Sequence, residues 1–129
     1  MSKQDRKNKI VQHLAPMKGR SVFNKSLQRQ VKFTRKGIKE IGEKGKFSNL
    51  SMSAAMDAPN QAKKAVKVGV TPAKKNRKQQ EMKLKKMIIM RGKHQGKATK
   101  VNVGMTANGE HKIYSVTLLK RKRPTHGPW

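Results

Sequence analysis

Four residues in the last third of the sequence have side chains suited to phosphodiester chemistry: Lys100, His111, Ser115 and Thr117. A lysine neutralises a phosphate, hydroxyl groups position its oxygens, and a histidine can move a proton near neutral pH. RNA supplies its own nucleophile, the 2′-hydroxyl, so a protein that cuts RNA needs groups that transfer protons and cations that stabilise the developing charge. We predict these four residues as the catalytic groups of a site that uses no metal.

A β-hairpin is predicted to bring the four residues onto one face of a sheet. Asn108-Gly109 is a strong signal for a two-residue turn, because both residues accept positive φ. A slip of this register by one residue would bury lysine and asparagine, so we keep it. The apolar face then holds the pairs Val103–Tyr114, Val101–Val116 and Thr99–Leu118, and the polar face holds Thr106–His111, Asn102–Ser115 and Lys100–Thr117.

The polar face has two interpretations, an ordinary solvated sheet face and the floor of a groove that receives a phosphodiester. Lys86 joins this face if Met87 and Ile89 point inward. The basic run over residues 74–78 is likewise either a solvated loop or a direct phosphate contact. The residues predicted to bind nucleic acid are Lys36, Lys39, Lys74, Lys75, Arg77, Lys78, Lys86, Asn102, Lys120 and Arg121.

The charge balance favours a polyanion as partner. The chain has 129 residues, enough for one domain, with 33 Lys and Arg against 6 Asp and Glu and a formal net charge of +27. Nucleic acid is favoured over an anionic membrane, because the basic runs have no broad apolar face and no stretch of about 18 apolar residues occurs. The polar start over residues 1–9 is unlike a signal peptide, so we expect a cytoplasmic site of action.

Cysteine is absent, which removes disulfides, zinc–cysteine sites and thiol nucleophiles. The four histidines are far apart and form no ligand-spaced pair, so no metal and no cofactor is predicted. Aromatic residues are few, which argues against a platform on which bases stack. We expect contacts to phosphate and to the shape of the RNA to dominate.

The pattern along the chain predicts an α+β domain. N-terminal helices would pack on a small antiparallel sheet built from a C-terminal three-stranded meander and one N-terminal strand. Thr34 and Ser48 are suited to cap two helices, and Pro59 is suited to end the second. The predicted parts are a basic leader over 1–18 with a helix over 4–14, a single domain over 19–122, a strand over 30–33, helices over 35–44 and 49–58, a basic linker over 70–80, strands over 82–91, 97–106 and 110–121, and a tail over 123–129.

Several short motifs resemble a domain found in large polyvalent proteins of phages and conjugative elements. They are Gly19-Arg-Ser-Val22, then Val31-Lys-Phe-Thr-Arg-Lys-Gly-Ile-Lys-Glu-Ile41, and the last-strand motif Lys112-Ile-Tyr-Ser-Val-Thr117. That family is related to the barnase–EndoU–colicin–RelE superfamily of small ribonuclease folds. The resemblance implies a metal-independent, toxin-like ribonuclease, and an acidic inhibitor or immunity protein as its partner.

Two functions therefore stay open. The first is a hydrolase-class ribonuclease, with tRNA and rRNA as candidate substrates. The second is a non-catalytic basic protein that binds nucleic acid, associated with the ribosome or with phage packaging, whose arms over 3–9 and 120–123 follow phosphates. Other phosphoryl-transfer or hydrolase classes are disfavoured, because the sequence has no Walker loop, no HExxH and no GxSxG motif.

Overall fold

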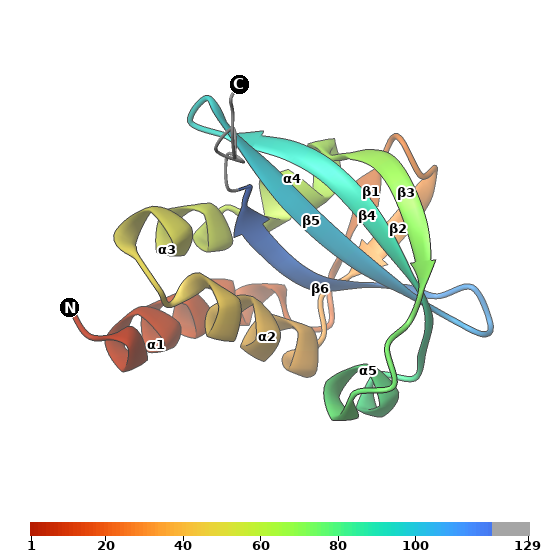
Figure 1. Ribbon diagram of the computed structural model, residues 1–129, viewed down its shortest axis with the longest axis horizontal. Coiled ribbons are helices and arrows are strands. Elements are labelled where there is room, and N and C mark those ends of the chain that lie inside the picture. Colours follow the sequence, from red (N-terminus) through yellow and green to blue (C-terminus); the bar gives the residue numbers. More distant parts are fainter. Residues whose placement is uncertain (120–129) are drawn as a thin grey trace, which may run out of the picture.

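A computed structural model describes residues 1–119, which form five α-helices, a short 3₁₀ turn and six strands. The helices lie mainly in the first half of the chain, and the three longest strands lie in the second half (Figure 1). The elements are α1 (Lys3–Leu14), the 3₁₀ turn (Ala15–Met17), β1 (Ser21–Asn24), β2 (Arg29–Lys32), α2 (Arg35–Gly45), α3 (Asn49–Met56), α4 (Ala58–Lys64), β3 (Val66–Pro72), α5 (Arg77–Glu81), β4 (Leu84–His94), β5 (Lys97–Thr106) and β6 (His111–Leu118).

The six strands form one curled sheet in the order β1-β2-β6-β5-β4-β3. The α+β class is confirmed, and so are the antiparallel neighbours β4, β5 and β6 of the predicted meander. The sheet is larger than predicted, because β1 and β3 extend it to six strands. It is also mixed rather than antiparallel, since β2 runs parallel to β6 over the pairs Val31–His111 and Lys32–Lys112.

Polar side chains tie the two ends of the curled sheet together. Asn24 at the end of β1 is buried and donates hydrogen bonds to the carbonyl oxygens of Ala62 (2.8 Å) and Ala65 (2.9 Å), just before β3. The backbone N–H of Lys67 donates to the Ser26 hydroxyl at 3.0 Å. The strands at the two ends of the sheet order are therefore linked through the β1–β2 turn.

The predicted helix caps are present. The hydroxyl of Thr34 accepts from the N–H of Gly37 at 3.0 Å, and Ser48 accepts from the N–H of Ser51 at 3.0 Å. Pro59, however, does not end a helix at that point. It occupies the first turn of α4, where proline is tolerated because the first N–H groups of a helix have no intrahelical acceptor.

Two predicted segment boundaries are wrong. The leader over 1–18 is part of the domain, because Ile10 and Leu14 of α1 are fully buried in the main core. The linker over 70–80 contains the end of β3 and most of α5. The predicted tail lies outside the described residues.

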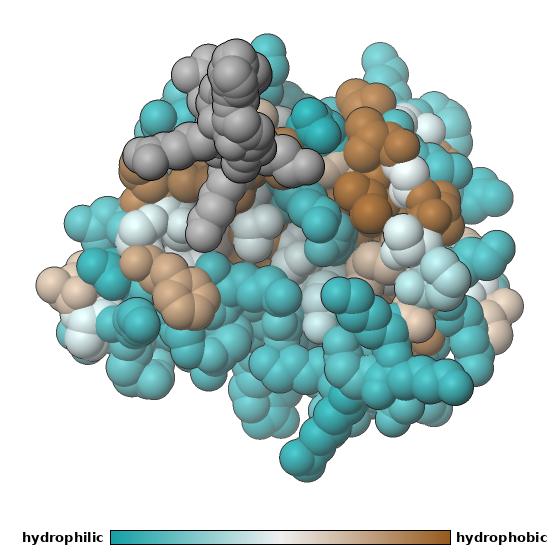
Figure 2. All heavy atoms as spheres, in the orientation of Figure 1, coloured by the Kyte–Doolittle hydropathy of each residue, from teal (hydrophilic) through white to brown (hydrophobic). Residues whose placement is uncertain are grey.

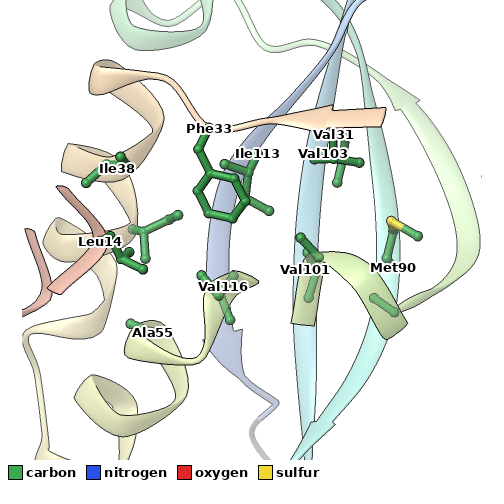
Figure 3. Close-up of a cluster of buried hydrophobic side chains, with 14 of the residues drawn as sticks. Leu14, Val31, Phe33, Ile38, Ala55, Met90, Val101, Val103, Ile113 and Val116 are labelled. Carbon is green, nitrogen blue, oxygen red and sulfur yellow. The ribbon is translucent and has the colours of Figure 1, made fainter. Parts of the chain in front are cut away.

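The main core lies between the sheet and helices α1 to α4 (Figure 3). Phe33, just after β2, is fully buried between strand and helix side chains, so it joins the two layers. Burial of apolar area at roughly 25 cal/mol per Å² is the main favourable term for such a core. The labelled side chains of the cluster are Leu14, Val31, Phe33, Ile38, Ala55, Met90, Val101, Val103, Ile113 and Val116.

Four of the six predicted pairs between β5 and β6 are confirmed. Lys100–Thr117, Asn102–Ser115, Val101–Val116 and Thr99–Leu118 pair as expected. Nearer the turn the pairs are Val103–Ile113, Gly104–Lys112 and Met105–His111, so Val103–Tyr114 and Thr106–His111 are wrong. The loop spans three residues instead of two, with positive φ at Gly109 only, and a β-bulge at Tyr114 restores the predicted register beyond it.

Gly37 allows α2 to approach β6 closely. A Cβ built at this position would lie 2.4 Å from the carbonyl oxygen of Ile113, a backbone atom that cannot rotate away. Gly37 is the middle residue of the Lys36-Gly37-Ile38 motif, and its neighbour Ile38 is buried in the core. The glycine of this motif is therefore required by the packing of helix against strand.

We expect Gly37→Ala to destabilise the fold by about 1–3 kcal/mol, the usual cost of forcing an extra methyl group into a packed contact. Gly69→Ala in β3 is the matched control, because a Cβ there meets no atom within 4 Å and its φ is not positive. Urea unfolding followed by circular dichroism measures both. Equal stability of the two variants would contradict the close approach.

Candidate nucleic-acid groove

The sheet face opposite the main core is called the outer face. Residues of β4, β5 and β6 that alternate with the core residues point to it, among them Ile89, Asn102 and Ser115. A second, smaller cluster of buried residues lies there, formed by Met82, Leu84, Met87 and Tyr114. The outer face is thus apolar toward α5 and polar toward the middle of β5.

A cleft of about 340 Å³ opens on this face, and we call it the outer groove. Its floor comes from β4, β5 and β6, and its walls come from α2, the end of β3 and α5. No aspartate or glutamate is among its lining residues, whereas three lysines are. The lining residues are Lys44, Thr71, Pro72, Lys74, Asn76, Gln79, Met87, Ile89, Lys100, Asn102 and Tyr114.

The wall formed by α5 is held in place through α2 and Gln79. The ammonium of Lys78 lies 2.7 Å from the buried carboxylate of Glu40, and this hydrogen bond raises the pKa of Lys78. Gln79 is buried and accepts from the N–H of Lys74 at 2.7 Å.

In the view of Figure 2 the surface over α2 and α5 is hydrophilic, while a patch over β3 is apolar because Val66, Val68 and Val70 are exposed.

The bulge in β6 places Tyr114 at the bottom of the outer groove. Its side chain is buried, and the ammonium of Lys44 lies 5.8 Å from the ring centre. Burial raises the pKa of the Tyr114 phenol above 10.0, opposed in part by hydrogen bonding to the Gln79 side chain. The phenol is therefore a proton donor that stays protonated at neutral pH.

Four residues of the predicted polar face do come together. Lys100 pairs with Thr117, and Asn102 pairs with Ser115, so all four side chains point to the outer face. Lys100 and Asn102 line the outer groove directly. Ser115 lies buried beside them and accepts a hydrogen bond from the Asn102 amide at 3.1 Å.

His111 does not belong to this group, which corrects the sequence prediction. It pairs with Met105, whose side chain packs against the main core, so His111 points to the core side of the sheet. It is 8% exposed, and its Nδ1 lies 2.8 Å from the carbonyl oxygen of Gly109. The physical reason is the bulge, because one extra residue in β6 reverses the alternation between residues 111 and 115.

The other predicted binding residues are spread over the surface. Lys36, Lys39 and Lys78 line a separate cleft together with the carboxylates of Glu40, Glu43 and Glu81, so part of their charge is neutralised. Lys74 lines the outer groove, whereas Lys75 and Arg77 are exposed and Arg77 pairs with Glu81. Lys120 and Arg121 lie outside the described residues.

Lys86 is not on the polar face. Its predicted place required Met87 and Ile89 to point inward, but Ile88 and Met90 are the core residues of β4. Met87 and Ile89 point to the outer groove instead. Because side chains alternate along a strand, Lys86 points to the core side of the sheet.

Sequence reasoning missed four polar residues of the outer groove: Lys44, Thr71, Asn76 and Gln79. They come from α2, from β3 and from α5 with its capping residue Asn76, so their proximity depends on tertiary packing. The predicted register places Tyr114 on the apolar face, whereas the bulge in β6 places it on the outer face. Within residues 1–119, no group of three or more His, Asp or Glu side chains could hold a metal ion.

The fold and groove define a small, strongly basic α+β domain with a lysine-lined cleft on one sheet face. The chain belongs to the family described as large polyvalent protein-associated domain 3, whose sequence pattern matches residues 1–114. This confirms the resemblance to domains of polyvalent proteins. Comparison with curated proteins and with solved structures gave no significant match.

Across the described residues, no helix is long and apolar enough to cross a membrane.

The burial of Tyr114 can be tested directly, because it is the single tyrosine of the chain. We expect the phenol of the folded protein to ionise above pH 10.0 and to return to its ordinary pKa in denaturant, as read from ultraviolet absorbance. Because the folded pKa is raised, the associated stability is complete below pH 10 and is lost as pH rises through the folded pKa. Titration at the ordinary pKa in the folded protein would place Tyr114 in solvent.

Proposed function

We propose that this domain binds RNA, and that the outer groove holds the sugar–phosphate backbone of a single strand. The observation that carries the proposal is the lining of the groove, where Lys44, Lys74 and Lys100 converge without any carboxylate among the lining residues. Lysines attract phosphates, and neutral amides and hydroxyls fix the position of the strand. The net charge of +27 adds attraction over a longer range.

One feature of the groove favours RNA over DNA. The amide oxygen of Asn102 is buried and has no hydrogen-bond partner within the described part of the chain. A buried acceptor without a donor costs about 1–3 kcal/mol, which a new donor would recover. The ribose 2′-hydroxyl is a donor that DNA lacks, and Asn102 lines the groove in which the ribose would lie.

Replacement of two groove lysines should weaken RNA binding specifically. We expect Lys74→Ala combined with Lys100→Ala to lower the affinity for a single-stranded RNA at least about tenfold at physiological salt. The slope of log affinity against log salt should become less steep by about 1.4, since each phosphate contact on a single strand contributes about 0.7. Fluorescence anisotropy of a labelled RNA across a salt series measures both quantities.

The matched control is Lys9→Ala combined with Lys18→Ala, which removes the same charge from exposed positions in and after α1. We expect less than a threefold loss of affinity for this variant. Equal losses in the two double variants would mean that net charge alone drives binding. A parent slope shallower than about −3 would contradict the several phosphate contacts that the proposal requires.

A second candidate function is cleavage of the bound RNA without metal, as in toxin-like ribonucleases. The position of Tyr114 favours it, because a buried phenol that stays protonated could donate its proton to the leaving 5′-oxygen. The three lysines of the groove would stabilise the charge that develops on the phosphate. An acidic inhibitor protein is the partner expected for such an activity.

Incubation with total RNA in EDTA tests this second function, with fragments read on a gel. We expect Tyr114→Phe to reduce cleavage at least about tenfold, since one acid–base group typically contributes about 10²–10⁴-fold. His111→Ala is the control, because His111 points to the core side and should leave the cleavage rate per folded molecule unchanged. Binding by the parent without any cleavage would leave the non-catalytic binder as the function.

A further inference from the structure

A serine, a histidine and an aspartate are aligned on the core side of the sheet, away from the outer groove. The Oγ of Ser53 in α3 lies 2.8 Å from Nε2 of His94, at the end of β4. The Nδ1 of the same ring lies 3.0 Å from Oδ2 of Asp57, between α3 and α4. This is the order of contacts by which an imidazole, oriented by a carboxylate, removes the proton of a nucleophilic serine.

The aspartate is itself held by a buried network. The amide of Gln61 donates to Asp57 Oδ2 at 3.2 Å and to the carbonyl oxygen of Lys93 at 2.5 Å. Its oxygen accepts from the hydroxyl of Thr99 at 2.7 Å, and both Gln61 and Thr99 are at most 2% exposed. Each polar atom of the Gln61 side chain is therefore satisfied, which fixes the orientation of Asp57.

Gly92 makes room for this network. A Cβ built there would lie 2.3 Å from the Gln61 side-chain oxygen and 2.8 Å from the Thr99 hydroxyl. The adjoining turn is tight, with positive φ at both Gln95 and Gly96, so His94 is presented at the end of a rigid two-residue hairpin. The cluster rests on strands and helices whose mutual positions are fixed by the core.

An open apolar cleft is lined by neighbours of the serine and the histidine, although neither of these two residues is among its lining. It has a volume of about 610 Å³, and Leu50, one helical turn before Ser53, lines it from α3. Lys97, which pairs with His94 across the hairpin, lines it from β5. The remaining lining residues are Ser51, Gly96, Ala98, Leu118 and Leu119, so the cleft suits an apolar chain with a cation at one end.

We propose that Ser53, His94 and Asp57 form an esterase site for small carboxylic esters with an apolar acyl chain. Ser53 Oγ bonds to the acyl carbon while its proton passes to His94 Nε2, and the ester C–O bond breaks as the alcohol takes that proton. Water then adds to the acyl-serine, giving a proton to His94, and the Ser53 oxygen leaves and recovers it. Lys97 is the cation available for the oxyanion, and Asp57, Gln61 and Thr99 are positioning residues.

A fluorophosphonate probe with an alkyl chain tests the nucleophile in the full-length protein. We expect covalent labelling of the parent at a single serine, Ser53, located by mass spectrometry of its peptides. Ser53→Ala should abolish the labelling and His94→Asn should slow it at least about a hundredfold. Ser21→Ala is the matched control, because this exposed serine of β1 lies away from the cleft and has no histidine partner, so the labelling of Ser53 should be unchanged.

The hydrogen bonds of His94 to Ser53 and Asp57 could also serve only to hold α3 against the β4–β5 hairpin. Measurements of ester turnover and of its pH dependence distinguish catalysis from this structural role. We expect hydrolysis of a short-chain nitrophenyl ester that slows at acid pH, because an imidazolium cannot accept the serine proton. Asp57→Asn should lower the rate, and Asp57→Glu should restore part of it. Peptide mapping of the parent that shows no label on Ser53, or labelling of Ser53 that persists undiminished in a folded His94→Asn variant, would overturn the proposal.

Discussion

One extra residue in β6 determines which side chains reach each face of the sheet. The bulge at Tyr114 separates two stretches of the β5–β6 pairing that differ in register by one residue. Before the bulge, His111 and Ile113 point to the core side, and after it Ser115 and Thr117 point to the outer face. The bulge also leaves Tyr114 on the outer face, where α5 and α2 close around it. The outer groove and the removal of His111 from it therefore have the same cause.

The few carboxylates of the chain are used where elements meet. Glu43 pairs with Lys7 of α1 and with Lys46, and these two lysines lower its pKa to about 2. Glu40 pairs with Lys78 of α5, and Asp57 contacts His94 at the β4–β5 hairpin. With 33 basic residues to balance, these negative charges compensate little of the self-repulsion, but they hold separate elements together. Most of the positive charge is therefore not compensated by carboxylates, and three lysines line the outer groove without an aspartate or glutamate beside them.

The local parts of the fold were predictable, and the parts that depend on packing were not. Thr34 and Ser48 cap helices as expected, because a cap needs only neighbouring residues. The β4–β5 and β5–β6 hairpins show how far turn residues alone predict the length of a loop. Asn108-Gly109 indicated a two-residue turn and forms part of a three-residue one, whereas the Gly92–Gly96 segment continues β4 and ends in a two-residue turn at Gln95-Gly96. For the groove, Lys74, Lys100 and Asn102 were predicted, but Lys44 and Gln79 come from helices whose positions no local pattern specifies.

The two candidate sites lie on opposite faces of the same strands, which makes them separable. Lys100 and Asn102 of β5 point to the outer groove, while Thr99 between Lys100 and the hairpin points to the network of Gln61 and Asp57. Alternation along a strand thus assigns neighbouring residues to different sites. Because the groove acts through the charge of its lysines and the serine site through short hydrogen bonds between partly buried groups, salt should weaken the first far more than the second. A rigid sheet between them allows each site to be altered by substitution without repacking the other.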